Sequence, residues 1–255
     1  MNQHGLTLCS RFAYPPNSYA LCGPSKQNDL CWYASNVHGD KGLSDILSQF
    51  TTLYPYLCFI AGENNIKDPF DPLVVEAYWI GNSLLEKTSQ SRFALYLEDT
   101  LGVKKRITRT GYTTLLSKLH IGALPHHAFH VINIWRRTGH DDSPHSAKSM
   151  EACLINWGKV TKIMKYSLTI DTYPLIYHQK ILKFGSKQQR NIRAYALNQN
   201  IHQITVGDWI SYHWGILCVR ISLIQLQRLI FYTQKAIHLF NQTTSYETKN
   251  YIYHR

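Results

Sequence analysis

The stretch Cys153–Val160, with the sequence CLINWGKV, decides the fold that we expect for this chain. It opens a region of short segments rich in β-branched and aromatic residues, which is typical of strands. We interpret it as strand, bend at Gly158 and strand. Farther along, Val206–Asp208 predicts a turn, and the sequence WISYHWGILCVRI that follows it predicts one long strand. Three more strands are expected at residues 167–170, 175–177 and 180–184.

The chain before this region has helical periodicity instead. Apolar residues at alternating intervals of four and three predict one helix from Leu43 to Leu57, with Ser44 as its cap and Gly62 as its end. A second helix is predicted to begin at Asp71-Pro72, because aspartate is a good N-cap and proline suits the first helical position. Its apolar stripe is expected to contain Leu73, Ala77, Ile80 and Leu84. Weaker helical patterns cover residues 93–101 and 113–119, and an amphipathic helix is expected at residues 222–240.

These patterns predict an α+β protein in three parts. The polar stretch at residues 141–149 separates the helical and the β-rich regions. We therefore expect a mainly helical domain at 1–147, a small β-barrel at 148–221, and a C-terminal helix and tail at 222–255.

The composition narrows the class of protein. The chain has 255 residues, of which 44% are hydrophobic, and a formal charge of +11, so a folded protein with acidic or anionic partners is expected. The absence of a signal peptide and of a long apolar run predicts a cytoplasmic protein without a membrane span. Six dispersed cysteines without a CxxC pair then indicate reduced thiols.

The two decisive stretches resemble the HypC-type maturation chaperones of nickel–iron hydrogenases. In that family a cysteine, a short apolar strand and Gly-Lys-Val open an OB-like barrel, as Cys153, Gly158, Lys159 and Val160 do here. A later Val-Gly-Asp turn leads to a strand that carries a histidine and then a glycine. Gly207, Asp208, His213 and Gly215 match that second motif.

The resemblance implies a non-enzymatic accessory or maturation factor. Cys153 would hold iron as a thiolate, with His213 nearby, while an Fe(CN)₂CO unit is carried between partners. The partner would be the hydrogenase large-subunit precursor or a maturation scaffold protein. Thiolate and imidazole are compatible donors for such iron. In this chain, however, Cys153 is internal rather than at the chain start, and Trp157 replaces the proline that is usual before the glycine.

Strand alternation gives an independent reason to consider His213. Trp209, Ser211 and His213 share one face of the predicted strand, and Ile210, Tyr212 and Trp214 share the other. We therefore expect His213 to point out of the barrel. The alternative interpretation is that Cys153 is a buried small apolar residue and His213 a hydrogen-bonded structural histidine.

A second candidate metal site is the histidine cluster in Pro125–Val131. On a helix or a strand, His126 and His130 would align, and with His127 they could bind zinc, nickel or iron. Equally, these histidines could form hydrogen bonds between domains. The residues that follow, 131–135, alternate like a buried strand.

Two other classes of function stay open. Cys22 before Gly-Pro is similar to the cysteine of papain-like and transglutaminase-like enzymes, so a thiol hydrolase or a histidine-ligated metalloenzyme is the enzymatic alternative. An OB-type barrel with Trp209, Tyr212 and Trp214 could instead bind single-stranded nucleic acid, although no nucleic-acid motif surrounds the basic clusters.

The whole chain also resembles an uncharacterised prokaryotic family. The motifs that carry this resemblance are RFAYPPN at Arg11–Asn17, LCGP at Leu21–Pro24, DPFDP at Asp68–Pro72, and PHHAFHV at Pro125–Val131.

Overall fold

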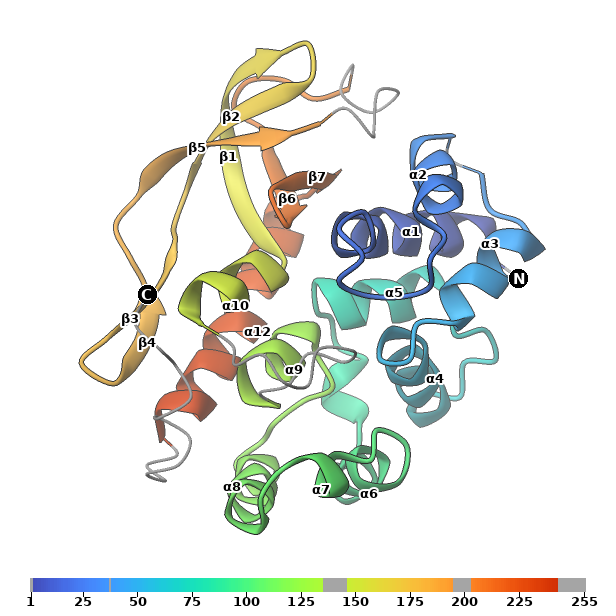
Figure 1. Ribbon diagram of the computed structural model, residues 1–255, viewed down its shortest axis with the longest axis vertical. Helices are drawn as coiled ribbons and strands as arrows, with labels where there is room; N and C mark the ends of the chain where they lie inside the picture. The colour runs from blue at the N-terminus through green and yellow to red at the C-terminus, as the bar shows by residue number, and fades with distance from the viewer. Residues whose placement is uncertain (1, 37, 135–145, 195–202, 243–255) are drawn as a thin grey trace.

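The computed structural model describes residues 2–36, 38–134, 146–194 and 203–242. It is a mixed α+β protein in which helices fill the first half and strands dominate after residue 155, as Figure 1 shows. The helices are α1 (Gln3–Asn17), α2 (Gln27–Asn36), α3 (Lys41–Ser48), α4 (Leu53–Glu63), α5 (Pro72–Trp79), η1 (Leu85–Lys87), α6 (Gln90–Asp99), α7 (Val103–Arg106), α8 (Arg109–His120), α9 (His127–Asn133), α10 (Ala147–Cys153) and α12 (Leu223–Gln242).

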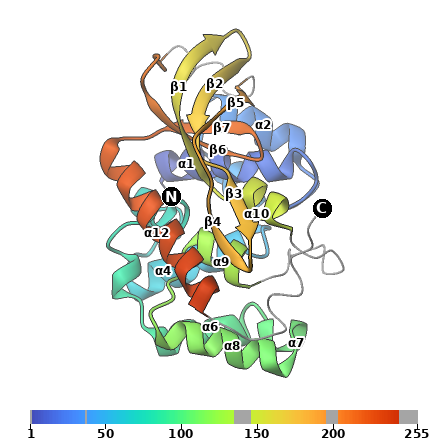
Figure 2. The ribbon, with the colours of Figure 1, turned by 90° about the vertical axis from the view of Figure 1, so that its left-hand side faces the viewer.

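The strands form two sheets. They are β1 (Asn156–Met164), β2 (Ser167–Thr172), β3 (Leu175–His178), β4 (Ile181–Phe184), β5 (Gln188–Arg193), β6 (Trp209–His213) and β7 (Ile216–Arg220). Five of them close on themselves in the order β1-β2-β5-β7-β6, since β6 also pairs with β1. The β3–β4 hairpin is separate and extends from the barrel beside the end of α12, which the two views in Figures 1 and 2 both show.

The helix predicted from Leu43 to Leu57 is two helices. α3 ends at Ser48 and α4 begins at Leu53, and proline explains the break. Pro55 has no amide proton, and in a continuous helix its ring would clash with the carbonyl of Thr51. The cap is also different from the predicted Ser44, because Asp40 Oδ1 accepts from Leu43 N at 2.9 Å.

The helix expected after Asp71-Pro72 is confirmed, with Asp71 Oδ1 accepting from Leu73 N at 2.8 Å. Its predicted stripe is partly wrong. Leu73 is exposed, and Val74, Val75 and Tyr78 are among the residues that face the core instead.

The stretch around Cys153 also differs from the prediction. Cys153 is the last residue of α10, whose N-cap is Ser146, so the strand begins only at Asn156. β1 then runs through Gly158 without the expected bend. Glycine is required there because a Cβ would lie 2.6 Å from Cδ1 of Ile170 on β2, so Gly158 allows the two strands to approach.

The long strand predicted from Trp209 to Ile221 is a hairpin. Trp214 and Gly215 have φ of +50° and +70°, which is the backbone of a two-residue hairpin turn, and β6 and β7 pair on either side of it. Asp208 closes the preceding turn, which was predicted, because its Oδ2 accepts from Thr205 N at 2.8 Å.

Residues 131–134 were expected to form a strand and instead belong to α9 and its C-cap, because His126 begins a helix there; Trp135 lies outside the described residues. Strand β5 had no sequence signal, since its residues are mostly polar and only Ile192 is buried within it. Residues 141–145 of the predicted linker are likewise outside the described ranges.

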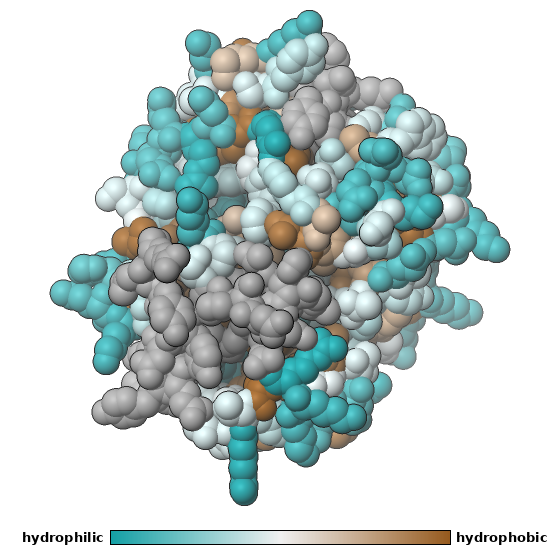
Figure 3. Space-filling model, in the orientation of Figure 1, coloured by the Kyte–Doolittle hydropathy of each residue, from teal (hydrophilic) through white to brown (hydrophobic). Residues whose placement is uncertain are grey.

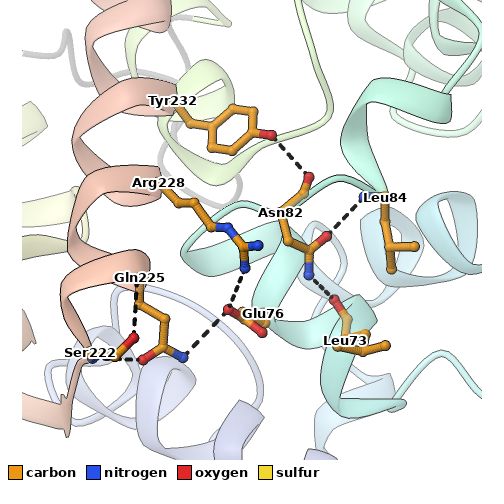
Figure 4. Close-up of polar contacts among 8 residues, drawn as sticks. All are labelled: Leu73, Glu76, Asn82, Leu84, Ser222, Gln225, Arg228 and Tyr232. Atoms are coloured by element: carbon orange, nitrogen blue, oxygen red, sulfur yellow. Dashed lines mark hydrogen bonds and ion pairs between the residues drawn. The ribbon is translucent and has the colours of Figure 1, made fainter.

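The closing helix α12 packs across the helical region and anchors it, as Figure 4 shows. Arg228 lies 3.5 Å from Glu76 on α5, Gln225 Nε2 donates to the same carboxylate at 3.4 Å, and Tyr232 donates to the carbonyl of Asn82 at 3.0 Å. The side-chain amide of Asn241 also accepts from the backbone N–H of Leu182 on β4 and donates to its carbonyl. The helix therefore connects both halves of the molecule.

No described helix is long and apolar enough to cross a membrane. The face of the molecule drawn in Figure 3 is largely hydrophilic, with hydrophobic residues in small separate groups.

Candidate metal centre

Three side chains with metal-ligand atoms meet where the helical region contacts the barrel. They are His127 at the start of α9, Cys153 at the end of α10 and His213 at the end of β6, and one ligand atom of each lies within 4.8 Å of the others. Both histidines are buried and Cys153 is partly buried. It is the only such group of three or more His, Cys, Asp or Glu residues in the part of the chain that the structure describes.

A backbone carbonyl organises the two imidazoles. The carbonyl oxygen of Cys153 lies 2.8 Å from Nε2 of His127 and 2.8 Å from Nε2 of His213. It can accept from outside its helix because it is at the C-terminus of α10, where the last carbonyls have no intrahelical partner. The two histidines thereby converge beside the Cys153 side chain.

The other nitrogen of His213 is held by the first helix. Its Nδ1 lies 2.9 Å from the carbonyl oxygen of Phe12. Within α1 that carbonyl would normally accept from the amide of residue 16, but Pro16 has no amide proton. The two consecutive prolines in RFAYPPN therefore leave a carbonyl that fixes the orientation of His213.

His127 has a different second partner. Its Nδ1 lies 3.2 Å from the hydroxyl of Tyr78 on α5, and a tyrosine hydroxyl can either donate or accept. The tautomer with Nε2 protonated donates to the Cys153 carbonyl and accepts from Tyr78 at Nδ1, whereas in the other tautomer Nδ1 donates to Tyr78 and the Nε2 lone pair is available to a metal.

Burial keeps both imidazoles neutral. It lowers the pKa of His127 well below its usual value and that of His213 to about 4. A neutral His213 has one N–H, yet both of its ring nitrogens face carbonyl oxygens. If the proton is on Nδ1, the Nε2 lone pair faces the carbonyl of Cys153, a contact that a bound cation would relieve.

The donor set fits a soft or borderline transition metal. Two neutral imidazoles and a thiol provide N, N and S ligands, the set that zinc, iron and copper favour over magnesium or calcium. The separation of up to 4.8 Å is larger than the ligand spacing in a tetrahedral site, so a small inward movement of the side chains would accompany binding.

The other two histidines of the predicted cluster lie outside this group. His126 is the N-cap of α9, with its Nδ1 accepting from Ala128 N at 3.2 Å and its ring stacked on Tyr232, and burial lowers its pKa to about 3. His130 points to the hydroxyl of Tyr56, 3.3 Å from its Nδ1. Of the three histidines in the predicted cluster, His127 is the one that the fold brings to Cys153, and nothing in the sequence singled it out.

The His213 side chain points out of the barrel, as strand alternation predicted. Ile210 and Tyr212 are buried inside the barrel, and the Tyr212 hydroxyl lies 3.1 Å from that of Thr172. His213 instead meets the helical region, where its ring contacts Trp79 at a centroid distance of 5.8 Å. Its burial comes from those helices, which strand alternation alone does not reveal.

A mainly apolar cavity of about 70 Å³ adjoins the three donors. Its lining includes His127, Cys153 and His213 themselves, together with Trp79 and Val131. Such a volume exceeds what one water molecule needs, so small molecules have room next to the donors.

Cys22, the candidate nucleophile, lines the same cavity. Burial raises the pKa of its thiol to about 11, so the thiol is protonated at neutral pH. Cys22 also precedes a loop rather than beginning a long buried helix. Both features disfavour a papain-like role, because that chemistry needs a thiolate.

Comparisons with known proteins give a family without an assigned activity. Neither a curated protein nor a solved structure matched the chain. A family model described as a family of unknown function, DUF6390, matches residues 1–247, which agrees with the resemblance of the whole chain to an uncharacterised family. The chain therefore belongs to the DUF6390 family.

Proposed function

We propose that this chain is an accessory or maturation factor for a nickel–iron hydrogenase and that it holds iron through Cys153 and His213. One observation carries the proposal: the cysteine and the histidine of the two HypC-like motifs, 60 residues apart in sequence, have ligand atoms within 4.8 Å of each other. His127 adds a donor from the helical region, which a free-standing barrel would lack.

The surroundings of the donors suit a carrier of iron. The iron, as an Fe(CN)₂CO unit, is cargo rather than a resident cofactor. The Cys153 thiolate is its soft ligand, and the two neutral imidazoles are borderline ligands that need no deprotonation at neutral pH. The adjoining apolar cavity limits access of bulk water to the cargo.

The barrel supplies a docking surface in this proposal. We interpret the five closed strands as an OB-like barrel. Residues 156–220 contain nine lysines and arginines but two aspartates, a formal +7 of the +11 of the chain. Both aspartates are in ion pairs, Asp171 with Lys187 and Asp208 with Arg220. The surplus of positive charge favours an acidic protein partner, either the large-subunit precursor or a maturation scaffold.

The test is an infrared spectrum of protein purified without oxygen from cells that express hydrogenase maturation genes. The wild type is compared with Cys153→Ala, His127→Ala and the control Cys31→Ala, whose cysteine is on α2 and does not line the cavity. We expect cyanide and carbonyl stretching bands in the wild type and the control. They should be absent in Cys153→Ala and weakened or shifted in His127→Ala.

Bands that persist in Cys153→Ala, or the absence of bands in the wild type, would contradict the proposal. Circular dichroism of each variant ensures that lost bands reflect a lost ligand rather than unfolding. Direct titration with Fe(II) and Zn(II) separates general metal binding from the specific carrier function.

A further inference from the structure

A second cavity adjoins His130. It has a volume of about 150 Å³, and both His130 and Thr52 line it as well as the apolar cavity beside the metal centre. The remaining polar members of its lining are Thr51, Thr100 and Arg106. These polar residues lie just before α4, just after α6, on α7 and on α9.

The polar lining of this cavity consists of three threonine hydroxyls, the imidazole of His130 and the guanidinium of Arg106, without a carboxylate. Three threonine hydroxyls can donate, and Arg106 provides a permanently charged planar fork. Within the described part of the chain Arg106 makes no ion pair, whereas Lys104 on the same helix pairs with Glu98. Thr52, which lines the cavity, is the N-cap of α4, so the N-terminal end of that helix lies next to the cavity.

We propose that this second cavity binds a small tetrahedral oxyanion, either free phosphate or the headgroup of a small phosphate monoester. Donors from four elements surround the space, which matches the several acceptor directions of a tetrahedral anion better than the two oxygens of a carboxylate. Arg106 and Thr100 are exposed at the mouth, and Thr52 is buried at the inner end, so an anion can enter from solvent. The inference does not depend on iron chemistry at the neighbouring centre.

The test is calorimetric titration of the full chain with inorganic phosphate at constant ionic strength in chloride. We expect one site per chain and at least about tenfold weaker binding in Arg106→Gln, because a guanidinium contact to an anion is lost. The matched control is Lys105→Gln, which removes one exposed charge from the same helix but no cavity residue, and should bind within about twofold of the wild type. Thr100→Val should weaken binding without any change of charge.

The same titration with glycerol 3-phosphate and with acetate distinguishes free phosphate from a phosphate monoester and from a carboxylate. Tighter binding of glycerol 3-phosphate than of phosphate assigns the site to a monoester headgroup, and weaker binding assigns it to the free ion. Acetate that binds as tightly as phosphate would overturn the choice of a tetrahedral anion. No heat above the chloride control, or equal weakening in Arg106→Gln and Lys105→Gln, would overturn the site itself.

Discussion

The buried lysine at the end of α8 allows a quantitative prediction about stability and pH. The side chain of Lys118 has no exposed surface, and its Nζ lies 6.0 Å from the ring centroid of Phe240 on α12. Burial lowers its pKa from 10.5 to about 7. In the unfolded chain it binds its proton up to pH 10.5, so folding below that pH requires either loss of the proton or burial of the charge.

The direction of the pH dependence of stability follows from the difference between the pKa of Lys118 in the unfolded chain and in the folded chain. Between pH 7 and pH 10.5 the unfolded state binds more protons than the folded state, so the free energy of unfolding rises with pH. From the two pKa values, the cost of Lys118 to folding is about 4 kcal/mol at pH 7 and about 2 kcal/mol at pH 9. The variant Lys118→Met removes this cost while it keeps a long apolar side chain.

The assay is urea unfolding of the wild type and Lys118→Met at pH 7, 8 and 9. This window is chosen because buried His126 and His213, whose pKa values are lowered, affect stability below pH 6.5. Buried Cys9, whose pKa is raised to about 12, acts above pH 9. We expect the advantage of the variant to fall by about 2 kcal/mol from pH 7 to pH 9. A difference that stays constant over this range would refute the reasoning.

The remaining predictions concern single contacts. Tyr78→Phe removes the hydroxyl beside Nδ1 of His127 and should weaken Zn(II) binding about tenfold in a competition titration; unchanged affinity would argue that His127 is not a ligand. Gly158→Ala should destabilise the chain by about 1–3 kcal/mol in urea, because its Cβ would clash with Ile170. Tyr232→Phe should lower the free energy of unfolding in urea by about 1 kcal/mol, because the hydrogen bond to the Asn82 carbonyl is lost; an unchanged free energy would show that water replaces this bond. Single-stranded DNA should bind weakly in fluorescence anisotropy; tight binding that falls steeply with salt would favour the nucleic-acid alternative.

Local signals in the sequence were sufficient for much of the fold. Asp71-Pro72 specified a helix start, and the Val-Gly-Asp turn was visible because the side chain and backbone preferences act within a few residues. The break before α4 and the turn at Trp214-Gly215 were missed, although Pro55 and Gly215 were the available signals. Strand β5 could not be predicted, because polar residues become a strand there only through pairing with β2.

Part of the candidate site could also be predicted from local sequence motifs, and part of it could not. The motifs around Cys153 and His213 indicated two residues that the fold brings together. The contribution of His127 depends on how α9 packs against α10 and the barrel, which is a long-range property that no spacing encodes. The role of Pro16 was equally invisible, since a missing amide becomes meaningful only when a histidine from far along the chain lies beside the carbonyl that it leaves.

The shared carbonyl of Cys153 has a mechanical consequence. Its oxygen contacts a histidine 26 residues earlier, in the helical region, and one 60 residues later, in the barrel, so the two regions cannot separate there without breaking one of these hydrogen bonds. A metal ion held by the same three side chains would act as a non-covalent cross-link between distant parts of the chain. In the proposed carrier, loading would tighten the contact between the two regions, and release of the cargo would be coupled to their opening.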